Sequence, residues 1–433
     1  MEAAAKSKKV GNADHIAQVQ SANKKILLIN YDFPPNAGIG GRRWAIFAKY
    51  LTRLGYEIHV LMRKPEPGSV SSFDVFVQGN ERIIRHHLPS YYPKTLSTQP
   101  RTIIQKLRYR LWHKAMLLLS RGTPFDKTVI GSYFIRRKIR TLHRKESFTL
   151  MVVSGAPFRL CYYAARERDR LKVPLLIDLR DPWTWGKGYG FVALSERRKN
   201  YEKKMERFTL EKADCVTVPV EIMRENLCDH YPEWEQKFHL LPHGYDEEII
   251  SLHDGNRFKQ SRVLRIVHFG TINDYIESEI DAIARVIGSY HGGIALTFYA
   301  ASEKYKEIFE GAGVLNKFVF YRKQVSQQQV FEELGKYDFS LILHPEYGRN
   351  NFSTKIYETI FSGTPIMYIG SEGELSEFFQ RTGSGIHIAP QEIEKELNPD
   401  KIRKSYNFVR TEEVAQFSYT ELTQKLLAIT GRR

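Results

Sequence analysis

The sequence contains few cysteines and no long hydrophobic run. Its three cysteines, Cys161, Cys215 and Cys228, have neither CxxC spacing nor a neighbouring group of histidines, so neither a disulfide framework nor a metal site is expected. The longest apolar cluster, residues 116–119, covers barely one helical turn, whereas a membrane-spanning helix needs about 20 apolar residues. Residues 1–23 lack the apolar centre of a secretory signal. We therefore expect a cytoplasmic protein with reduced thiols and without a spanning helix.

Acidic residues are nearly absent from one segment. Residues 82–145 hold 16 Lys and Arg against a single acid, Asp126, in a chain of 433 residues whose net charge is +16. Residues 1–250 carry +17 and the remainder carries −1. We infer that the basic segment faces an anionic partner.

Short apolar runs alternate with segments compatible with helix along the whole chain, which predicts an α/β protein with largely parallel sheets covered on both faces. A polar, turn-rich stretch at 243–261 separates two such series. The first series predicts strands at 25–30, 57–62, 149–153, 174–177 and 214–218, with helices at 42–54, 159–171 and 196–212. The second predicts strands at 264–270, 294–300, 317–321, 339–344 and 365–370, with helices at 278–290, 303–310, 326–336, 354–362 and 404–430.

The loop after the first predicted strand is rich in glycine and reads NAGIGGRR. It lies at the carboxyl edge of the sheet, where open parallel sheets bind ligands. The spacing GxGG differs from GxGxxG, and no acid ends the second strand, so NAD binding is not expected. The loop is either a ligand-binding turn or a plain tight turn. Its candidate acceptor or phosphate residues are Gly38, Gly40, Gly41 and Arg42.

Charged residues gather at the end of the predicted strand in VPLLIDLRDPWTW. We expect Asp178, Arg180 and Asp181 to point into a cleft, with a carboxylate near a reacting sugar. Trp183 and Trp185 offer flat faces for carbohydrate rings. The alternative is an Arg–Asp pair that serves stability alone.

The sequence NNFSTKIYE leads into a predicted helix whose start favours an anion. Ser353 or Thr354 can cap the helix, and Lys355 adds a cation to its first turn. A basic residue at a helix N terminus is unfavourable unless it meets an anion such as a diphosphate. Glu358 lies one turn further on, where it can accept hydrogen bonds from ribose hydroxyls. The alternative is an amphipathic core helix with solvated Lys and Glu.

Residues 103–119 carry a helical pattern of their own. Apolar residues recur at helical spacing, and basic residues occupy the other side, although Arg108 interrupts the apolar stripe. We predict that this helix binds an anionic membrane surface; the alternative is an ordinary core-packed helix with a solvated basic side. The apolar stripe is Ile104, Leu107, Leu111, Ala115 and Leu118, and the basic side is Lys106, Arg110, His113 and Lys114.

Taken in chain order, these motifs resemble those of the GT-B glycosyltransferases of family 4, the retaining group that uses nucleotide-sugar donors. The resemblance covers nearly the whole chain. It is carried by ILLINYDFPPNAGIGGRRWAIFAKYLTRLGYEIHVL, by SGAP at 154–157, LIDLRDPW at 176–183, ADCVTVP at 213–219 and LPHGYD at 241–246, and by HFGTI and FSTKIYETIFSGTPIMYIG.

The resemblance implies two Rossmann-like domains that face each other across a cleft. Residues 24–250 would bind the acceptor and residues 262–403 the donor nucleotide, with the helix at 404–430 packing back on the first domain. Glu358 matches the second acid of the family's Glu-x7-Glu motif, and Asn350 replaces the first. The implied catalytic residues are Asp181, Lys355 and Asn350, and the implied donor-binding residues are Gly270, Thr271, Arg322, Arg349, Ser353, Thr354 and Glu358.

The resemblance further implies sugar transfer with retention of configuration from a nucleoside diphosphate, by default UDP, to a glycan or lipid-linked acceptor. Neither a cofactor nor a metal ion is expected. We expect the protein to act in polysaccharide or glycolipid synthesis, peripherally attached to the inner face of a membrane. A nucleotide-sugar 2-epimerase of the same fold is one alternative. A nucleic-acid-binding protein is another, disfavoured because the excess charge lies in one insertion.

Overall fold

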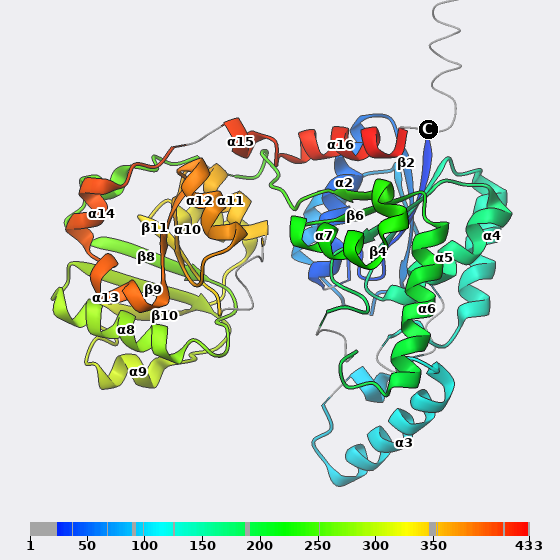
Figure 1. The fold of residues 1–433 in the computed structure, drawn as a ribbon, viewed down its shortest axis with the longest axis horizontal. Helices are drawn as coiled ribbons and strands as arrows, with labels where there is room; N and C mark the ends of the chain where they lie inside the picture. The colour runs from blue at the N-terminus through cyan, green and yellow to red at the C-terminus, as the bar shows by residue number, and fades with distance from the viewer. Residues whose placement is uncertain are drawn as a thin grey trace, which may run out of the picture. The chain divides into compact units, whose positions relative to one another are not determined.

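The computed structural model describes residues 24–36, 38–66, 68–88, 92–97, 99–123, 126–186, 191–250, 252–345, 352, 354–409 and 412–431. Contacts divide the chain into two compact units. The first comprises residues up to Leu241 together with Thr423–Arg433, and the second is Pro242–Leu422. Each unit contains one sheet between layers of helices (Figure 1), and a buried apolar core lies between sheet and helices. The predicted α/β architecture with two Rossmann-like domains is confirmed.

The sheet of the first unit has seven strands in the order β3-β2-β1-β4-β5-β6-β7, and every pairing is parallel. Most strands are short runs of buried residues, as expected where helices cover both faces. The strands are β1 Lys25–Ile29, β2 Glu57–Arg63, β3 Ile83–Leu88, β4 Leu150–Gly155, β5 Leu175–Leu179, β6 Cys215–Val218 and β7 Phe238–Leu240.

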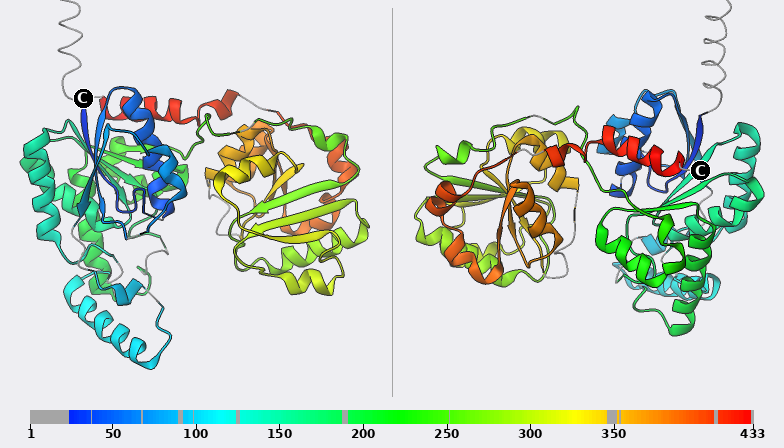
Figure 2. Two further views of the ribbon diagram at one scale, coloured as in Figure 1. Left: turned by 180° about the vertical axis from the view of Figure 1, so that it is seen from behind. Right: turned by 45° about the horizontal axis from the view of Figure 1, so that its top comes forward.

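Helices connect these strands in the way that parallel pairing requires. Gly55 has a φ of +88° just after α2, the left-handed conformation in which glycine commonly ends a helix. Helix α3 extends away from the sheet of its unit (Figures 1 and 2). The helices are α2 Arg42–Arg53, α3 Ile103–Ser120, α4 Ser132–Glu146, α5 Phe158–Leu171, α6 Glu196–Lys212 and α7 Glu221–His230.

The second unit repeats this plan with six parallel strands in the order β10-β9-β8-β11-β12-β13. Its strands are β8 Leu264–Phe269, β9 Ile294–Ala300, β10 Val319–Lys323, β11 Phe339–Leu343, β12 Ile366–Ile369 and β13 Gly385–Ile388. Its helices are α8 Glu277–Ser289, α9 Lys306–Gly311, α10 Gln327–Leu334, α11 Thr354–Ser362, α12 Glu374–Thr382, α13 Ile393–Glu396, α14 Pro399–Ser405 and α15 Glu412–Ala415, followed by α16 Tyr419–Gly431, most of which belongs to the first unit.

Each sheet has a point where the strand order reverses. This topological switch point lies between β1 and β4 in the first unit and between β8 and β11 in the second. Ligands of open α/β sheets bind outside the carboxyl ends of the strands at such points. We therefore expect ligand-binding residues in the loops after β1, β4, β8 and β11.

The expectation of one helix over 404–430 is wrong. Helix α14 ends at Ser405, and the chain then runs past Asn256, whose side-chain carbonyl accepts a hydrogen bond from the backbone N–H of Phe408 at 2.9 Å. Tyr406 and Phe408 are buried in the core of the second unit, so the chain at 406–408 is packed there and is not helical. Helix α16 returns to the first unit, where Cys215 Sγ donates to the carbonyl oxygen of Ile429.

None of the described helices combines the length and the apolar composition needed to cross a membrane.

Charged side chains form a compact cluster at the amino edge of the first sheet. Lys25 Nζ lies 3.1 Å from Glu57 Oε1 and 2.8 Å from Glu146 Oε2, and His59 Nε2 lies 2.7 Å from Glu57 Oε1. Glu57, His59 and Glu146 are spaced closely enough to hold a metal ion. The ammonium group of Lys25 already contacts both carboxylates, so the cluster works as an ion network of the fold.

His86 extends this cluster, and it makes the stability of the protein depend on pH. Burial, reinforced by the neighbouring charges of His59, Lys138 and Lys145 and opposed by Glu146, lowers the pKa of His86 to about 4. The unfolded chain binds that proton at about pH 6.5. Stability from a neutral His86 is therefore fully present above pH 6.5 and lost as the pH falls toward 4.

We expect the free energy of unfolding to fall by about 1–2 kcal/mol across this window, after allowance for partial exposure. His86→Gln should remove that part of the pH dependence, because glutamine takes no proton. Urea denaturation at closely spaced pH values measures it. His87→Gln, at an exposed position of the same strand, is the matched control; an equal change in both variants would contradict the assignment.

Candidate functional site

The glycine-rich loop after β1 packs closely against neighbouring loops. A Cβ atom on Gly41 would overlap the carbonyl oxygen of Asp32, and a Cβ atom on Gly40 would lie 3.0 Å from the guanidinium nitrogens of Arg180. Asn30 Nδ2 donates a hydrogen bond to the carbonyl oxygen of Gly40 at 3.2 Å. Close packing thus accounts for glycine at 40 and 41, and ligand binding by these residues stays a prediction.

Gly38 and Arg42 complete the predicted loop site. Gly38 has an extended φ of 176°, which any residue can adopt. Arg42 begins α2 and is buried, with its guanidinium carbon 5.8 Å from the centre of the Phe73 ring. The side chain of Arg42 is therefore packed inside the first unit.

Arg180 joins the loops that meet at the switch point of the first sheet. It follows β5, and its Nε donates to Ser154 Oγ at 3.0 Å and to the carbonyl oxygen of Gly155 at 2.9 Å. Its guanidinium also lies against Gly40. One half-buried cation thus holds the ends of β4 and β5 and the loop after β1 together.

Asp178 is a buried structural carboxylate, and the expectation that it points into a cleft is wrong. It is fully buried and accepts hydrogen bonds from Trp44 Nε1 at 2.7 Å and from Thr217 Oγ1 at 2.9 Å. Arg43 Nε lies 3.4 Å away and Ser154 Oγ donates at 3.2 Å. Asp178 lies within β5 and not beyond the end of the strand, which explains why it is buried. Its hydrogen bonds and ion pair connect α2, β4 and β6 to β5.

The residues after β5 differ in burial. Asp181 is half-buried directly beyond the strand, which is compatible with its predicted role. Trp183 is buried, donates to Glu202 Oε2 at 2.9 Å and stacks on Phe158 with ring centres 5.3 Å apart. The expected sugar-binding face of Trp183 is therefore covered by protein.

In the second unit, two residues predicted from separate motifs meet at the switch point. Gly270 follows β8 with a φ of +98°, a conformation that favours glycine. Lys355, in the first turn of α11, donates from Nζ to the carbonyl oxygen of Phe269 at 3.0 Å, and any Cβ on Gly270 would overlap this ammonium group. The absence of a side chain at 270 leaves the space that Lys355 occupies.

Glu358 lies on the second turn of the same helix and is buried. Its Oε1 accepts a hydrogen bond from Gln327 Nε2, at the start of α10, at 2.8 Å. Thr354 is the first residue of α11, so this helix begins at the residue that the sequence predicts. Arg349, Asn350 and Ser353 lie outside the described residues, as does the side chain of Thr354.

The remaining donor-binding candidates surround this turn. Arg322 is exposed near the end of β10, with its guanidinium carbon 5.9 Å from the centre of the Tyr299 ring, which in turn stacks on Phe269. Thr271 is exposed directly after Gly270. Lys355 and Arg322 thus supply positive charge at the carboxyl edge, where an anionic ligand would bind.

Sequence reasoning missed the side chains that hold this edge in place. Asn273 Nδ2 donates to the carbonyl oxygen of Leu343 at 2.7 Å, which joins the loop after β8 to the end of β11 across the switch point. Gln327 was also missed as the partner of Glu358. No local pattern marks either residue, because each partner is distant in the sequence.

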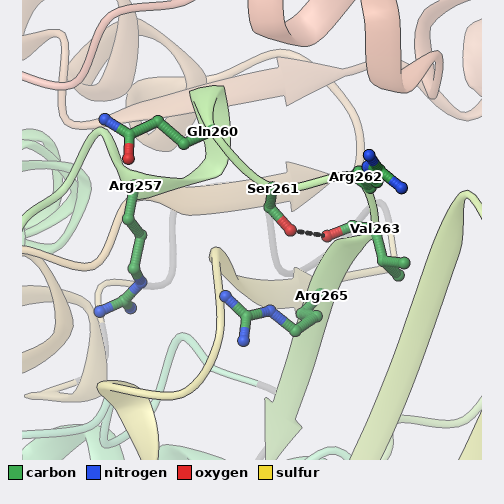
Figure 3. Close-up of a pocket in the computed structure, with 6 residues that line it drawn as sticks. All are labelled: Arg257, Gln260, Ser261, Arg262, Val263 and Arg265. Carbon is green, nitrogen blue, oxygen red and sulfur yellow. Dashed lines mark hydrogen bonds between the residues drawn. The ribbon is translucent and has the colours of Figure 1, made fainter.

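A separate hollow lies at the amino end of β8, away from Gly270 (Figure 3). Arg265 donates to both carboxylate oxygens of Asp338, and Arg257 donates to the carbonyl oxygen of Leu334 at 2.8 Å. These arginines therefore serve the fold. The hollow is lined by Arg257, Gln260, Ser261, Arg262, Val263 and Arg265.

Comparison with solved structures identifies the architecture. Sucrose-phosphate synthase from Thermosynechococcus elongatus superposes with a TM-score of 0.61 at 15% identity, over 94% of this chain and 98% of that one. Anabaena HepE in complex with UDP and glucose gives 0.58 at 12% identity, over 95% and 100%. A putative UDP-N-acetylglucosamine 2-epimerase from Listeria monocytogenes gives 0.54 at 11% identity, over 94% and 95%. The fold is GT-B.

Part of the chain also matches a known sequence family. Residues 117–249, within the first unit and the start of the second, match the model of the family described as Glycosyltransferase Family 4. No curated protein sequence matches significantly. The structural similarities are at low identity and establish the fold alone.

Substitution of Asp178, within β5, should lower the stability of the protein much more than substitution of Asp181, just after β5. Asp178→Ala removes the carboxylate that pairs with the buried Arg43 guanidinium and leaves three hydrogen-bond donors without this acceptor. We expect a loss of about 3–5 kcal/mol of unfolding free energy. Asp181→Ala, at a half-buried position, should cost under about 1 kcal/mol. Urea denaturation of both variants tests this. Equal losses would show that Asp181 is as structural as Asp178.

Proposed function

We propose that the protein is a glycosyltransferase that moves a sugar from a nucleoside diphosphate to a hydroxyl acceptor with retention of configuration. The GT-B fold and the Glycosyltransferase Family 4 match over 117–249 support the general activity. The retaining course rests on the resemblance of the sequence motifs.

The observation that carries this proposal is the placement of Lys355. Its ammonium group lies over Gly270 at the β8–β11 switch point, beside the N terminus of α11. A cation and a helix dipole held in fixed positions stabilise charge as it develops on a departing diphosphate. They do so without further reorganisation at the moment of reaction.

In the proposed reaction the bond between the anomeric carbon and the β-phosphate oxygen of the donor breaks. A bond from the same carbon to the acceptor oxygen forms on the same face. The proton of the acceptor hydroxyl passes to the departing phosphate, which leaves as the nucleoside diphosphate. We assign charge stabilisation to Lys355 and Arg322, with Arg349 as a further candidate, and contact with the donor sugar to Asn350.

We propose UDP as the nucleoside diphosphate, because HepE, a protein of the same fold, is seen with UDP and with UDP-glucose. Glu358 is buried beside the site, where its carboxylate is assigned to the ribose hydroxyls, oriented by Gln327. Asp181, at the edge of the first unit, is assigned to the acceptor. We propose a glycan or a lipid-linked sugar as the acceptor.

A nucleotide-sugar 2-epimerase is the second candidate, since the putative epimerase from Listeria monocytogenes shares the fold. An epimerase converts the nucleotide sugar without any acceptor. Product formation from UDP-sugars, with and without an acceptor, is followed by proton NMR of the fresh product. Transfer with the same anomeric configuration supports the proposal. An inverted anomer would overturn retention, and turnover of the nucleotide sugar alone would favour the epimerase.

Substitutions at Lys355 and Gly270 test the site. Lys355→Ala should lower turnover about 100-fold through lost stabilisation of the leaving group. Gly270→Ala should displace Lys355 and lower turnover as well, in addition to a backbone strain of about 1 kcal/mol.

Gly313→Ala is the matched control for Gly270→Ala. Gly313 has a φ of +68° but open space around it, so its substitution should cost similar stability and leave turnover unchanged. Steady-state kinetics and thermal unfolding separate the two effects. Equal loss of turnover in both glycine variants would contradict the role of Lys355.

A further inference from the structure

Helix α3 exposes the apolar stripe that the sequence predicts. Leu107 and Leu111 are each 68% exposed and Leu118 is 83% exposed. An isolated exposed leucine is ordinary on a protein surface, but a row of them at helical spacing marks an interaction site. The alternative of a core-packed helix is wrong for this stripe. Ile103, Ile104 and Leu119 are exposed on the same helix.

The opposite side of α3 contacts the first unit. Met116 and Ser120 are buried, and at 3.6 residues per turn they lie on the side of the helix opposite Leu107 and Leu111. Helix α3 therefore uses a short patch near its end for packing and turns its longer apolar stripe outward. Figures 1 and 2 show the helix extending from its unit.

Two arginines anchor the C-terminal end of α3. Arg198 Nη1 donates to the carbonyl oxygen of Gly122 at 2.8 Å, and its Nη2 donates to that of Leu117. Arg159 Nη2 donates to the carbonyl oxygen of Ser120 at 2.6 Å. Arg159 lies in the first turn of α5 and Arg198 in the first turn of α6. Because these helices follow β4 and β5, their N-terminal ends lie at the carboxyl edge of the sheet. Helix α3 is thus fixed to the same edge that holds the switch point.

The N-terminal end of α3 is capped by its own residues. Thr102 Oγ1 accepts from the backbone N–H of Gln105 at 3.3 Å, and the Gln105 side chain accepts from the N–H of Thr102 at 3.2 Å. This capping box gives hydrogen-bond acceptors to two backbone N–H groups at the start of the helix. None of these capping contacts uses the apolar stripe.

The charge around the stripe selects the kind of partner. Residues 99–123, which include α3, contain six Lys and Arg and no Asp or Glu. A second copy of this chain would bring the same excess of positive charge to the interface. A nucleic acid would meet the charge but leave the leucines without apolar contacts. The exposed basic residues on and next to the helix are Arg101, Lys106, Arg108, Arg110 and Lys114.

We propose that α3 docks the protein on an anionic phospholipid surface. The exposed leucines enter the boundary between headgroups and acyl chains, and the basic side chains contact lipid phosphates. Docking through α3 brings the carboxyl edge of the first sheet, where Arg159 and Arg198 hold the helix, to the membrane side of this unit. Docking on the membrane does not depend on the proposed sugar transfer, and its binding assay needs no sugar substrate.

Co-sedimentation with vesicles tests the docking. Vesicles of phosphatidylcholine with about 30% phosphatidylglycerol should bind the protein, and binding should fall about tenfold between roughly 50 and 300 mM NaCl. Leu107→Ser combined with Leu111→Ser should weaken binding about tenfold or more, because it removes apolar contact without changing charge. Val70→Ser with Val75→Ser, at exposed valines elsewhere on the first unit, is the control and should bind as the unaltered protein does.

The charge contribution is tested in the same assay. Lys106→Gln with Arg110→Gln should weaken binding and reduce its salt dependence, whereas Lys395→Gln with Lys404→Gln, exposed on the second unit, removes equal charge without effect. Equal binding to vesicles of phosphatidylcholine alone, or unchanged binding of the leucine variant, would overturn the proposal. Light scattering that shows a dimer lost in the leucine variant would assign the stripe to a second copy. Binding of a single-stranded oligonucleotide that the leucine variant retains, without vesicle binding, would assign the segment to nucleic acid.

Discussion

The parallel direction of the strands is the constraint on which the rest of this structure depends. Every described pairing in both sheets is parallel, so each strand delivers its following loop to one edge. Residues far apart in the sequence meet there without any local signal. Lys355 over Gly270 and Arg180 over Gly40 are two results of this arrangement.

The two units use their edges differently. In the first unit, the charged groups of Arg180 and Asp178 contact other protein groups and hold neighbouring segments in place. In the second, the ammonium group of Lys355 lies on a turn beside a helix N terminus, where the helix dipole favours an anion. This difference agrees with a donor site in the second unit and an acceptor site in the first, as the proposed function assigns them.

Much of the fold could be predicted from the sequence, because apolar runs and helix signals are local. The helices at 196–212 and 354–362 and the strand at 294–300 have the predicted bounds. The short strands β7 and β13 and the polar strand β3, with Arg and two His among its six residues, were missed because their pattern is weak. The depth of Asp178 could not be predicted, since burial depends on which strands flank β5. The partners of Glu358 and of Asn273 depend on strand order in the same way.

The capping of α3 at both ends affects how fast and how tightly its surface can bind. A segment that folds only on contact loses part of its binding energy to ordering, whereas a helix already held by Thr102 at one end and by Arg159 and Arg198 at the other does not. Its leucines are presented before any encounter. In the proposed docking, attachment through α3 would therefore need no slow conformational step, and its lifetime would be set by the escape of a few side chains.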